Sequence, residues 1–498
     1  MDKKRVIAID LGASSGRVIS AALENGRLEF DEIHRFANEG IHVGGRFYTD
    51  ILYVYREIIT GLKEAVRRGG TIESAAVDSW GVDFALLDGQ GELMCNPYHY
   101  RDEQAAGMIE EAEGIFGKRG LFMLTGVQDM WYNSVYQIQG IRRRNPGLLE
   151  RAECFLMIPD ILGYFLTGNR TVEYTSASTT QMYDLRRREW SEPIGSKLGL
   201  NVKLFPEVVM TGAFKGNFCP RAKRMIGLPD GKEIRLTAAA GHDSASAAYG
   251  VPAKEKNYIF ISSGTWSVIG KILDEPLITK EIYDRGYSNE GAAFGKIKLV
   301  KSIMGMWLIQ ELRKCWKNQG RETGYAFLTE ESRKAAAFSH MINVDDELFV
   351  APVDMEDSIN QYCIRTKQTV MKHQGEFYRT VMESLAFKYR EAIQDLENIA
   401  GERVDTIYLL GGAIQDQEFC KYIANVTGKC VSAGPVEATA VGNALIQMKA
   451  LGFLEDGDEY VRIIREAFNI RHYEPEETEV WNRMYERYKA VTAQKAAE

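Results

Sequence analysis

The stretch IDLGASSGRV, residues 9–18, decides the fold, because it joins two apolar segments through a turn of small residues. Residues 12–16 match G-x-S-x-G, the turn that carries the nucleophilic serine of many hydrolases. That turn needs a strand before it and a helix after it, at the top of a parallel sheet that already has several strands. Here it follows the first apolar strand, and the next residues, VISAAL, indicate another strand. The hydrolase interpretation therefore fails on context, and labelling of Ser14 by a fluorophosphonate would be needed to revive it.

The same turn is suited to binding a phosphate group. In a tight turn of glycine, alanine and serine, unobstructed backbone N–H groups converge into a small anion-binding nest. Asp10, at the end of the preceding strand, stands where a carboxylate can hold a magnesium ion, usually through water. An ordinary hairpin turn remains the alternative from this motif alone.

The elements around this turn follow from the hydrophobic pattern. Residues 5–36 predict three consecutive strands, with the Asn25-Gly26 turn between the second and the third. Residues 51–70 repeat apolar side chains at helical spacing and end in two glycines, which predicts a helix with its stop signal. Residues 72–93 predict two further strands around Trp80-Gly81.

An internal repeat extends this pattern to the second half of the chain. Residues 258–271, YIFISSGTWSVIGK, repeat the order strand, small-residue turn and strand found in residues 5–18. Near the end, VDTIYLLGGAIQDQEFCKYIANVTG predicts a strand, a Gly411-Gly412 turn and a helix. We therefore predict two α/β domains, residues 1–244 and 245–498, each directing a glycine turn into a common cleft.

Composition narrows the class of protein. The chain has 498 residues and a net charge of −8, which suits two large domains and offers no broad basic surface for nucleic acid or anionic lipid. No segment predicts a signal peptide or a membrane span, so we expect a cytoplasmic enzyme without an obligate protein partner. Cysteine and histidine show no zinc-binding spacing. The P-loop and the G-x-G-x-x-G motif of dinucleotide-binding folds are both absent.

Three further motifs carry candidate chemistry. The turn Ser262-Ser263-Gly264-Thr265 can bind the outer phosphates of a nucleotide, and the Gly411-Gly412 turn can lie against an adenine. His242-Asp243 precedes small residues that predict a helix, so the carboxylate is either a helix cap or a base that accepts a proton from a substrate hydroxyl. Asp78, Trp80, Gly81 and Asp83 are expected to line the same cleft.

Seven motifs, in order and in spacing, resemble the FGGY family of carbohydrate kinases over nearly the whole chain. They are IDLGASSGRV, VDSWGVDFALLD, GHDSASA, ISSGTWS, IMGMWLIQE, LLGGAIQ and AGPVEATAVGN. The resemblance implies two copies of the actin-like, ribonuclease-H-like ATPase fold that flank a cleft. It also implies transfer of the γ-phosphoryl group of ATP, with Mg²⁺, to the carbon-1 hydroxyl of a ketose, L-rhamnulose being the best match.

The resemblance also implies roles for individual residues. Asp243 would accept the proton of the sugar hydroxyl, and Asp10 would hold the metal. The ATP-binding residues would be Ala13, Ser14, Ser15, Gly16, Arg17, Thr265, Gln310 and Gly412. The sugar-binding residues would be Gly81, His242, Asp243 and Ser302.

Three positions depart from the family pattern. Ser302 stands where close members of the family have asparagine, and Gln104 stands where the R-D-x-R stretch has its second arginine. Ala413 replaces the third glycine of the adenine turn. The serine at position 302 leaves L-fuculose and L-xylulose open as alternative substrates. An actin-like ATPase that binds or senses a ligand is the alternative from another class.

Overall fold

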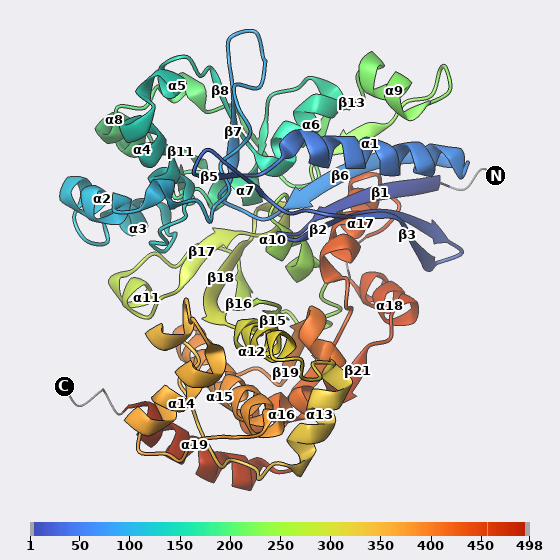
Figure 1. Ribbon diagram of the computed structural model, residues 1–498. Coiled ribbons are helices and arrows are strands. Elements are labelled where there is room, and N and C mark those ends of the chain that lie inside the picture. The colour runs from blue at the N-terminus through green and yellow to red at the C-terminus, as the bar shows by residue number, and fades with distance from the viewer. Residues whose placement is uncertain (1–3, 456, 494–498) are drawn as a thin grey trace. The chain divides into compact units, whose positions relative to one another are not determined.

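The computed structural model describes residues 4–455 and 457–493 (Figure 1). The chain forms two compact units. The first unit contains Met1–Lys254, Ile272–Val300 and Glu437–Phe468, and the second contains Glu255–Lys271, Lys301–Val436 and Asn469–Glu498. Two late segments of the chain thus belong to the first unit. The domain boundary drawn between residues 244 and 245 stays a prediction, and the compact units divide the chain at other places.

The first unit is built on a six-stranded mixed sheet in the order β13-β14-β6-β1-β2-β3. Strands β1, β2 and β3 form the predicted antiparallel meander, and β6 runs parallel to β1. Asn25 and Gly26 both have positive φ angles, as the turn between β2 and β3 requires. The strands are β1 (Lys4–Leu11), β2 (Ser15–Glu24), β3 (Arg27–Ala37), β6 (Thr71–Ser79), β13 (Phe214–Asn217) and β14 (Arg235–Thr237).

Helices cover both faces of this sheet. Ile7 and Ile9 of β1 belong to the core that also contains the buried residues of α1 (Ile51–Arg67). Val6 and Ala8 alternate with them and pack in a second core with α17 (Ala438–Ala450) and α18 (Asp458–Ala467). Figure 1 shows these two late helices beside the first strands of the chain. A strand buried on both faces explains why β1 is an almost continuous apolar run.

The remaining elements of the first unit include two that position the site. These are helix α10 (Asp243–Tyr249) and strand β17 (Ser288–Gly291). Strand β17 pairs antiparallel with β18 (Ile297–Met304). The other helices are α2 (Met108–Phe116), α3 (Gly120–Thr125), α4 (Ser134–Arg144), α5 (Pro146–Glu150), α6 (Ile158–Thr167), α7 (Tyr174–Ser178), α8 (Glu192–Leu198), α9 (Pro220–Ile226) and α11 (Lys280–Asp284). Short strand pairs are β4 (Ile41–Val43) with β5 (Arg46–Tyr48), β7 (Phe84–Leu87) with β8 (Cys154–Met157), β9 (Val172–Glu173) with β12 (Val208–Val209), and β10 (Tyr183–Asp184) with β11 (Glu189–Trp190).

The second unit repeats the hairpin of the first. Strand β15 pairs antiparallel with β16 and parallel with β19, as β1 pairs with β2 and β6. Its strands are β15 (Ile259–Ser263), β16 (Trp266–Leu273), β19 (Thr406–Leu410), β20 (Cys430–Ala433) and β21 (Arg471–Tyr473). Its helices are α12 (Trp307–Asn318), α13 (Tyr325–Lys334), α14 (Met355–Arg365), α15 (Gln374–Ala400), α16 (Gln417–Thr427) and α19 (Thr478–Thr492). The predicted strand, glycine turn and helix near the end of the chain are β19, residues 411–416 and α16.

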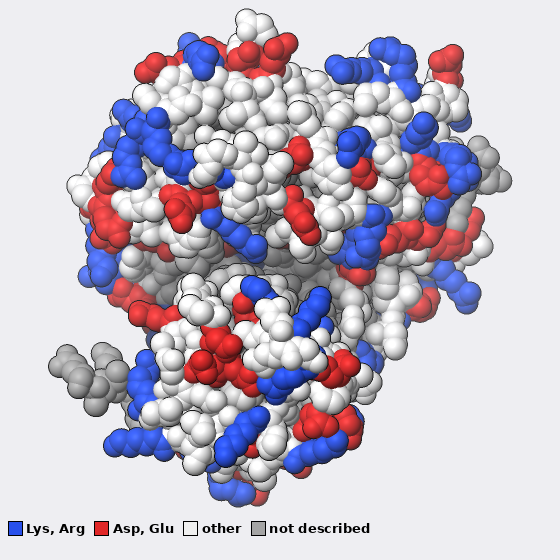
Figure 2. All heavy atoms as spheres, in the orientation of Figure 1, with Lys and Arg blue, Asp and Glu red and all other residues white. Residues whose placement is uncertain are grey.

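Charged side chains of both signs are interspersed over the face of the molecule that Figure 2 shows. This distribution agrees with the modest net charge of −8. Within residues 4–455 and 457–493, no helix has both the length and the apolar character that crossing a bilayer requires.

Candidate functional site

The turn between β1 and β2 exposes backbone donors. Gly12 N donates to Ser15 O at 2.9 Å, and the Asn38 side chain donates to Gly12 O at 2.7 Å. The N–H groups of Ala13 and Ser14 have no partner among the described residues, and Ser14 is exposed. A Cβ at Gly16 would lie 2.2 Å from the ring of Phe36, so this position excludes a side chain. The free N–H groups are of the kind that bind a phosphate oxygen.

Arg17 lies between two carboxylates of the first unit. Its Nη2 donates to Asp10 Oδ2 at 2.8 Å, and its Nη1 pairs with Glu437, the residue before α17. Sequence reasoning placed Arg17 at the phosphates but did not identify Glu437, although the AGPVEATAVGN motif contains it. A phosphate at this turn would therefore compete with Asp10 and Glu437 for the guanidinium group.

Two aspartates lie one residue before the ends of the neighbouring strands β1 and β6. Asp10 and Asp78 are opposite each other in the parallel register, and both are buried. Burial raises the pKa of Asp10 to about 6, with Arg17 opposing and Asp243 adding to the rise. Burial also raises the pKa of Asp78 well above its usual value, and the neighbouring Asp10 adds to this. Asp78 Oδ2 accepts a hydrogen bond from Asn443 Nδ2 at 2.5 Å, whereas its Oδ1 has no partner in the described part of the chain.

The donor set fits a hard cation that brings other ligands with it. Among the described residues, no group of three or more Asp, Glu, His or Cys side chains could hold a metal ion by itself. Mg²⁺ is commonly held by one or two carboxylates, with water and substrate phosphates completing the shell. Asp10 supplies a carboxylate beside the turn with free N–H groups, and Asp78 carries an unpartnered buried oxygen behind it. These residues therefore fit Mg²⁺ bound together with phosphate groups.

Asp243 is the first residue of α10, and His242 occupies the N-cap position without capping through its side chain. Asp243 Oδ1 accepts a hydrogen bond from Ser244 N at 2.6 Å, and 31% of its side chain is exposed. Partial burial raises the pKa of Asp243, an effect that His242 counteracts. The backbone is held firmly, because His242 N donates to Thr175 Oγ1 at 3.0 Å. The carboxylate can thus reach a substrate hydroxyl without serving as the helix cap.

Two residues that sequence reasoning missed stand beside His242. Lys298 of β18 is fully buried and pairs with Glu290 of β17. Glu290 Oε2 lies 3.4 Å from His242 Nδ1, and His242 Nε2 lies 3.4 Å from Asp243 Oδ1. The signal available in the sequence was a lysine that alternates with apolar residues in IKLVKSIM. A buried charge at such a position needs a partner.

The Trp80–Asp83 turn is largely structural. The Asp83 carboxylate is fully buried and accepts from Trp80 Nε1 at 2.8 Å, Tyr100 N at 3.0 Å and Gln137 Nε2 at 3.1 Å. Burial raises the pKa of Asp83 to about 7. Trp80 is also buried. Neither side chain is open to a ligand, unlike the arrangement expected from sequence.

The neighbours of this turn account for two predicted or divergent positions. A Cβ at Gly81 would lie 2.8 Å from the Thr179 side chain, so only glycine fits there. Gln104 is buried and donates to Gln137 Oε1 at 3.1 Å. Gln137 in turn donates to Asp83, so Gln104 is linked to the Trp80–Asp83 turn. The loss of arginine at position 104 thus alters a buried network.

The second unit contains a pocket of about 650 Å³ at its hairpin turn. It is lined by Ser263, Gly264, Met306, Gln310, Tyr325, Ala326, Thr329, Arg333, Tyr378, Gly412, Ala413, Gln415, Asp416, Gln417 and Glu418. The predicted residues Gln310 and Gly412 are thus brought together. Thr265 does not line the pocket, but its hydroxyl donates to Gln310 Oε1 at 3.2 Å.

The glycines of this pocket have separate roles. Gly411 has a φ of +84°, and a Cβ there would lie 2.7 Å from Ser263 O. A Cβ at Gly412 would meet nothing within 4 Å, so this residue leaves pocket space open. Ala413 lines the pocket but is buried, so its methyl group exposes little surface there.

Ser302 lies outside this pocket. It is on β18, four residues after Lys298, and its side chain is exposed. Alternation along the strand puts Ser302 and Lys298 on the same side of β18.

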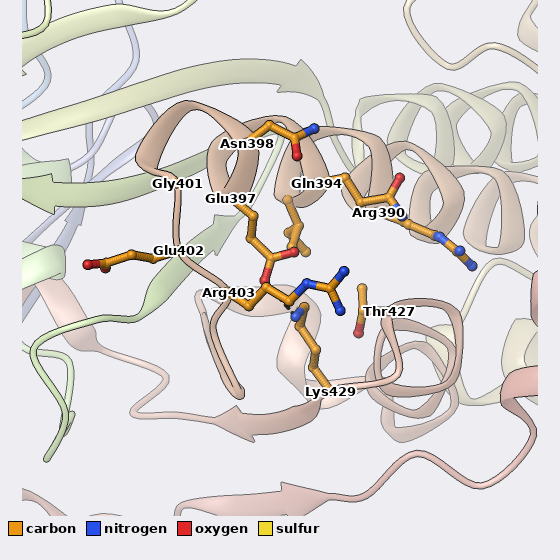
Figure 3. Close-up of a pocket in the computed structure, with 10 residues that line it drawn as sticks. Arg390, Gln394, Glu397, Asn398, Gly401, Glu402, Arg403, Thr427 and Lys429 are labelled. Atoms are coloured by element: carbon orange, nitrogen blue, oxygen red, sulfur yellow. Dashed lines mark hydrogen bonds and ion pairs between the residues drawn. The ribbon is translucent and has the colours of Figure 1, made fainter.

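Another pocket, of about 560 Å³, lies at the end of α15 and contains none of the predicted residues (Figure 3). Figure 3 shows Lys429 and Arg403 near Glu397, while Glu402 points away. Lys429 Nζ donates to Glu397 Oε1 at 2.7 Å and to Val404 O at 2.7 Å. These contacts secure the end of α15 to the start of β20.

Comparisons with known proteins identify relatives over nearly the whole chain. Residues 5–250 match the N-terminal domain, and residues 259–451 the C-terminal domain, of the FGGY family of carbohydrate kinases. The chain is 37% identical to a rhamnulokinase of Bacteroides thetaiotaomicron over 487 residues, which cover 98% of this chain and 99% of that one. It is also 37% identical to a rhamnulokinase of Oceanobacillus iheyensis over 467 residues, covering 94% and 97% of the two chains.

A solved structure supports the fold. The crystal structure of Plasmodium falciparum glycerol kinase with ADP matches with a TM-score of 0.81 at 15% identity and covers 99% of both chains. The family models together match most of the chain, and the sequence relatives span nearly all of it. The protein, with its two α/β domains, therefore belongs to the FGGY family of carbohydrate kinases, which use ATP to phosphorylate sugars.

Proposed function

We propose that this FGGY kinase transfers the γ-phosphoryl group of ATP to the carbon-1 hydroxyl of L-rhamnulose, in the cytoplasm. The rhamnulokinases to which it is 37% identical span nearly its full length, which supports this ketose over others. The observation that carries the proposal is the partly exposed Asp243 carboxylate. It belongs to the same unit as Asp10 and the turn of residues 12–16.

Asp243 acts as the base in this proposal. Its carboxylate accepts the proton of the carbon-1 hydroxyl as the oxygen attacks the γ-phosphorus. Phosphoryl transfer depends mostly on positioning and on neutralising charge, so Asp243 mainly orients the hydroxyl. The raised pKa of Asp243 makes it a better proton acceptor than a free aspartate, provided that it is ionised when the sugar binds.

In this proposal, each unit has its own residues assigned to the nucleotide. The pocket of the second unit receives the adenosine part, with Gly412 leaving room for the base and Gln310, fixed by Thr265, as a polar contact. The free N–H groups of residues 13–14 and the side chain of Arg17 bind phosphate oxygens. When bound, Mg²⁺ would neutralise charge on the phosphates, and Asp10 would hold it, directly or through water.

A related ketose is the second candidate, and Ser302 is the observation that favours it. A serine hydroxyl is shorter than the asparagine amide found in close members of the family, so it contacts a different part of the sugar. L-Fuculose and L-xylulose are therefore retained as alternatives. An ATPase that responds to no sugar is the alternative from another class.

A coupled assay for ADP release over a panel of ketoses tests the proposal. We expect L-rhamnulose to give the highest kcat/KM, with L-fuculose, L-xylulose, D-xylulose and D-fructose lower. A higher kcat/KM for another ketose would assign the enzyme to that sugar. ATP turnover that is the same with and without every sugar would contradict the kinase assignment itself.

A further inference from the structure

The buried ion pair between Glu290 and Lys298 has features that a purely structural pair does not need. The Lys298 side chain is 0% exposed, and that of Glu290 is 18% exposed. Burying an ion pair carries a desolvation cost, and an apolar pair of similar volume is often as stable. The imidazole ring of His242 lies between the pair and Asp243, and it contacts Glu290 and Asp243.

Glu290 contacts the described residues through only one of its two carboxylate oxygens. Oε2 accepts from Lys298 Nζ and lies 3.4 Å from His242 Nδ1. Oε1 has no partner among the described residues, yet it is not among their buried unpartnered atoms, so it remains accessible. Burial would raise the pKa of Glu290, but Lys298 and His242 outweigh it and hold that pKa at about 2. Glu290 therefore offers one fixed, ionised and open acceptor.

The neighbouring groups restrict what this acceptor can bind. His242 contacts both members of the pair, Glu290 and Lys298. It also contacts Asp243, the other charged side chain of this cluster. Tyr132 is the nearby neutral group, and burial first and Glu290 second raise its pKa. A carboxylate oxygen accepts hydrogen bonds from neutral hydroxyl groups and repels anions. A neutral polyhydroxylated molecule is thus the ligand chemistry that fits Oε1.

We propose that Glu290 is a sugar-binding residue whose free Oε1 accepts a hydrogen bond from a hydroxyl of the ketose, other than the one that faces Asp243. Lys298 is the corresponding positioning residue, because it fixes Oε2 without contacting the sugar. This inference rests on the proposed sugar kinase activity and names a residue that decides which ketose is accepted.

The first test is the variant Glu290→Gln, which keeps the shape of the side chain and removes its charge. A hydrogen bond to a charged group is worth enough that kcat/KM for the ketose should fall about 10- to 100-fold. The KM for ATP should stay within about twofold, because Glu290 is not among the residues assigned to the nucleotide. A variant with unchanged kcat/KM for the ketose would overturn the inference.

Monodeoxy ketoses give the sharper test. If Glu290 binds one hydroxyl, the loss caused by Glu290→Gln should disappear for the one analogue that lacks this hydroxyl, and persist for the others. An equal loss for every analogue would show that Glu290 acts only through the fold and would overturn the inference. Should Glu290→Gln fail to fold, Glu290→Asp keeps the charge but withdraws the oxygen by one methylene group, and it serves in the same comparison.

A matched pair of lysine variants tests the positioning role. Lys298→Met should raise the KM for the ketose, and Lys298→Arg should restore most of the loss. Lys296→Met is the control just before β18, because Lys296 and its partner Asp274 are 52% and 84% exposed. Equal effects of Lys298→Met and Lys296→Met would contradict the positioning role.

These outcomes are separable from the proposed function. A wild-type enzyme that phosphorylates no ketose contradicts the kinase proposal, whatever Glu290 does. An active wild-type enzyme with an indifferent Glu290→Gln variant contradicts only the inference about Glu290.

Discussion

The substitution Gly442→Ala tests how the site is supported by a helix from the far end of the sequence. A Cβ at Gly442 of α17 would lie 1.8 Å from Ser246 O of α10. The approach is reciprocal, since a Cβ at Gly250, just after α10, would lie 2.5 Å from Ala438 O. The two helices thus touch backbone to backbone, and Asp243 is the first residue of α10.

The expected magnitude follows from these distances. Real Cβ atoms almost never come closer than 3.0 Å to such a neighbour, so the helices must separate by about 1 Å. Overpacking costs about 1–3 kcal/mol, and the better helix propensity of alanine returns up to about 1 kcal/mol. A catalytic group displaced by about 1 Å can lower the rate ~100-fold. Activity should therefore suffer more than stability.

The assay measures kcat with the preferred ketose and the midpoint of thermal unfolding for the same preparation. We expect kcat to fall by about 10- to 100-fold and the midpoint to fall by only a few degrees. Gly114→Ala is the control, because Gly114 lies in α2 and a Cβ there meets nothing within 4 Å. A Gly442→Ala enzyme with wild-type kcat would refute the coupling between α17 and Asp243. If the midpoint of thermal unfolding were also unchanged, the close contact between α17 and α10 would be refuted.

Four other predictions concern individual side chains. Asp243→Asn should lower kcat by about 10²- to 10⁴-fold with a KM for ATP that stays near the wild-type value, and near-normal turnover would remove Asp243 as the base. In the wild-type enzyme, Asp243 accepts a proton only when ionised, and its pKa is raised by burial. The pH profile of kcat/KM should therefore decline as the pH falls through this raised value, whereas a profile that stays flat down to the pKa of a free aspartate would contradict the assignment. Gly412→Ala should place a methyl group in the nucleotide pocket and raise the KM for ATP about tenfold without loss of stability. Gly411→Ala should destabilise the fold, because Gly411 has a positive φ. Equal stability losses for both variants would argue against this division of roles. Lys215→Met should lower the free energy of unfolding by about 3–5 kcal/mol, because it leaves the buried Asp160 carboxylate without its partner at 2.5 Å. That loss should shrink at low pH, where Asp160 takes up a proton, and a pH-independent loss in urea titrations would indicate packing instead.

The local part of the fold could be predicted from the sequence. The Asn25-Gly26 turn, the small-residue turn at residues 12–16 and its copy at residues 262–265 each follow from short-range preferences. These turns fix where the hairpins form, and the hairpins carry most of the predicted phosphate-binding residues. The predicted helix over residues 51–70 is confirmed, and α1 spans Ile51–Arg67.

The long-range part could not be predicted in the same way. The pair Arg17–Glu437 and the hydrogen bond from Asn443 to Asp78 join residues more than 360 positions apart. Such contacts depend on which helix face meets which face of the sheet, and an apolar pattern does not specify its partner. The position of Lys298 opposite Glu290 likewise requires the register of β17 and β18. Sequence reasoning therefore found the turns and the candidate base, but not the charges that surround them.

The late segment Glu437–Phe468 has a consequence for biosynthesis. It covers one face of strands β1, β2 and β3, where Val6, Ala8 and Ile19 are buried against α17 and α18. A ribosome adds about 5–20 residues per second, so some 10–40 seconds separate the synthesis of residue 254 from that of residue 468. During that interval we expect the nascent first unit to expose an apolar sheet face, and such a surface is prone to aggregation. For the same reason, a recombinant fragment that stops at Lys254 would expose this face permanently and should aggregate.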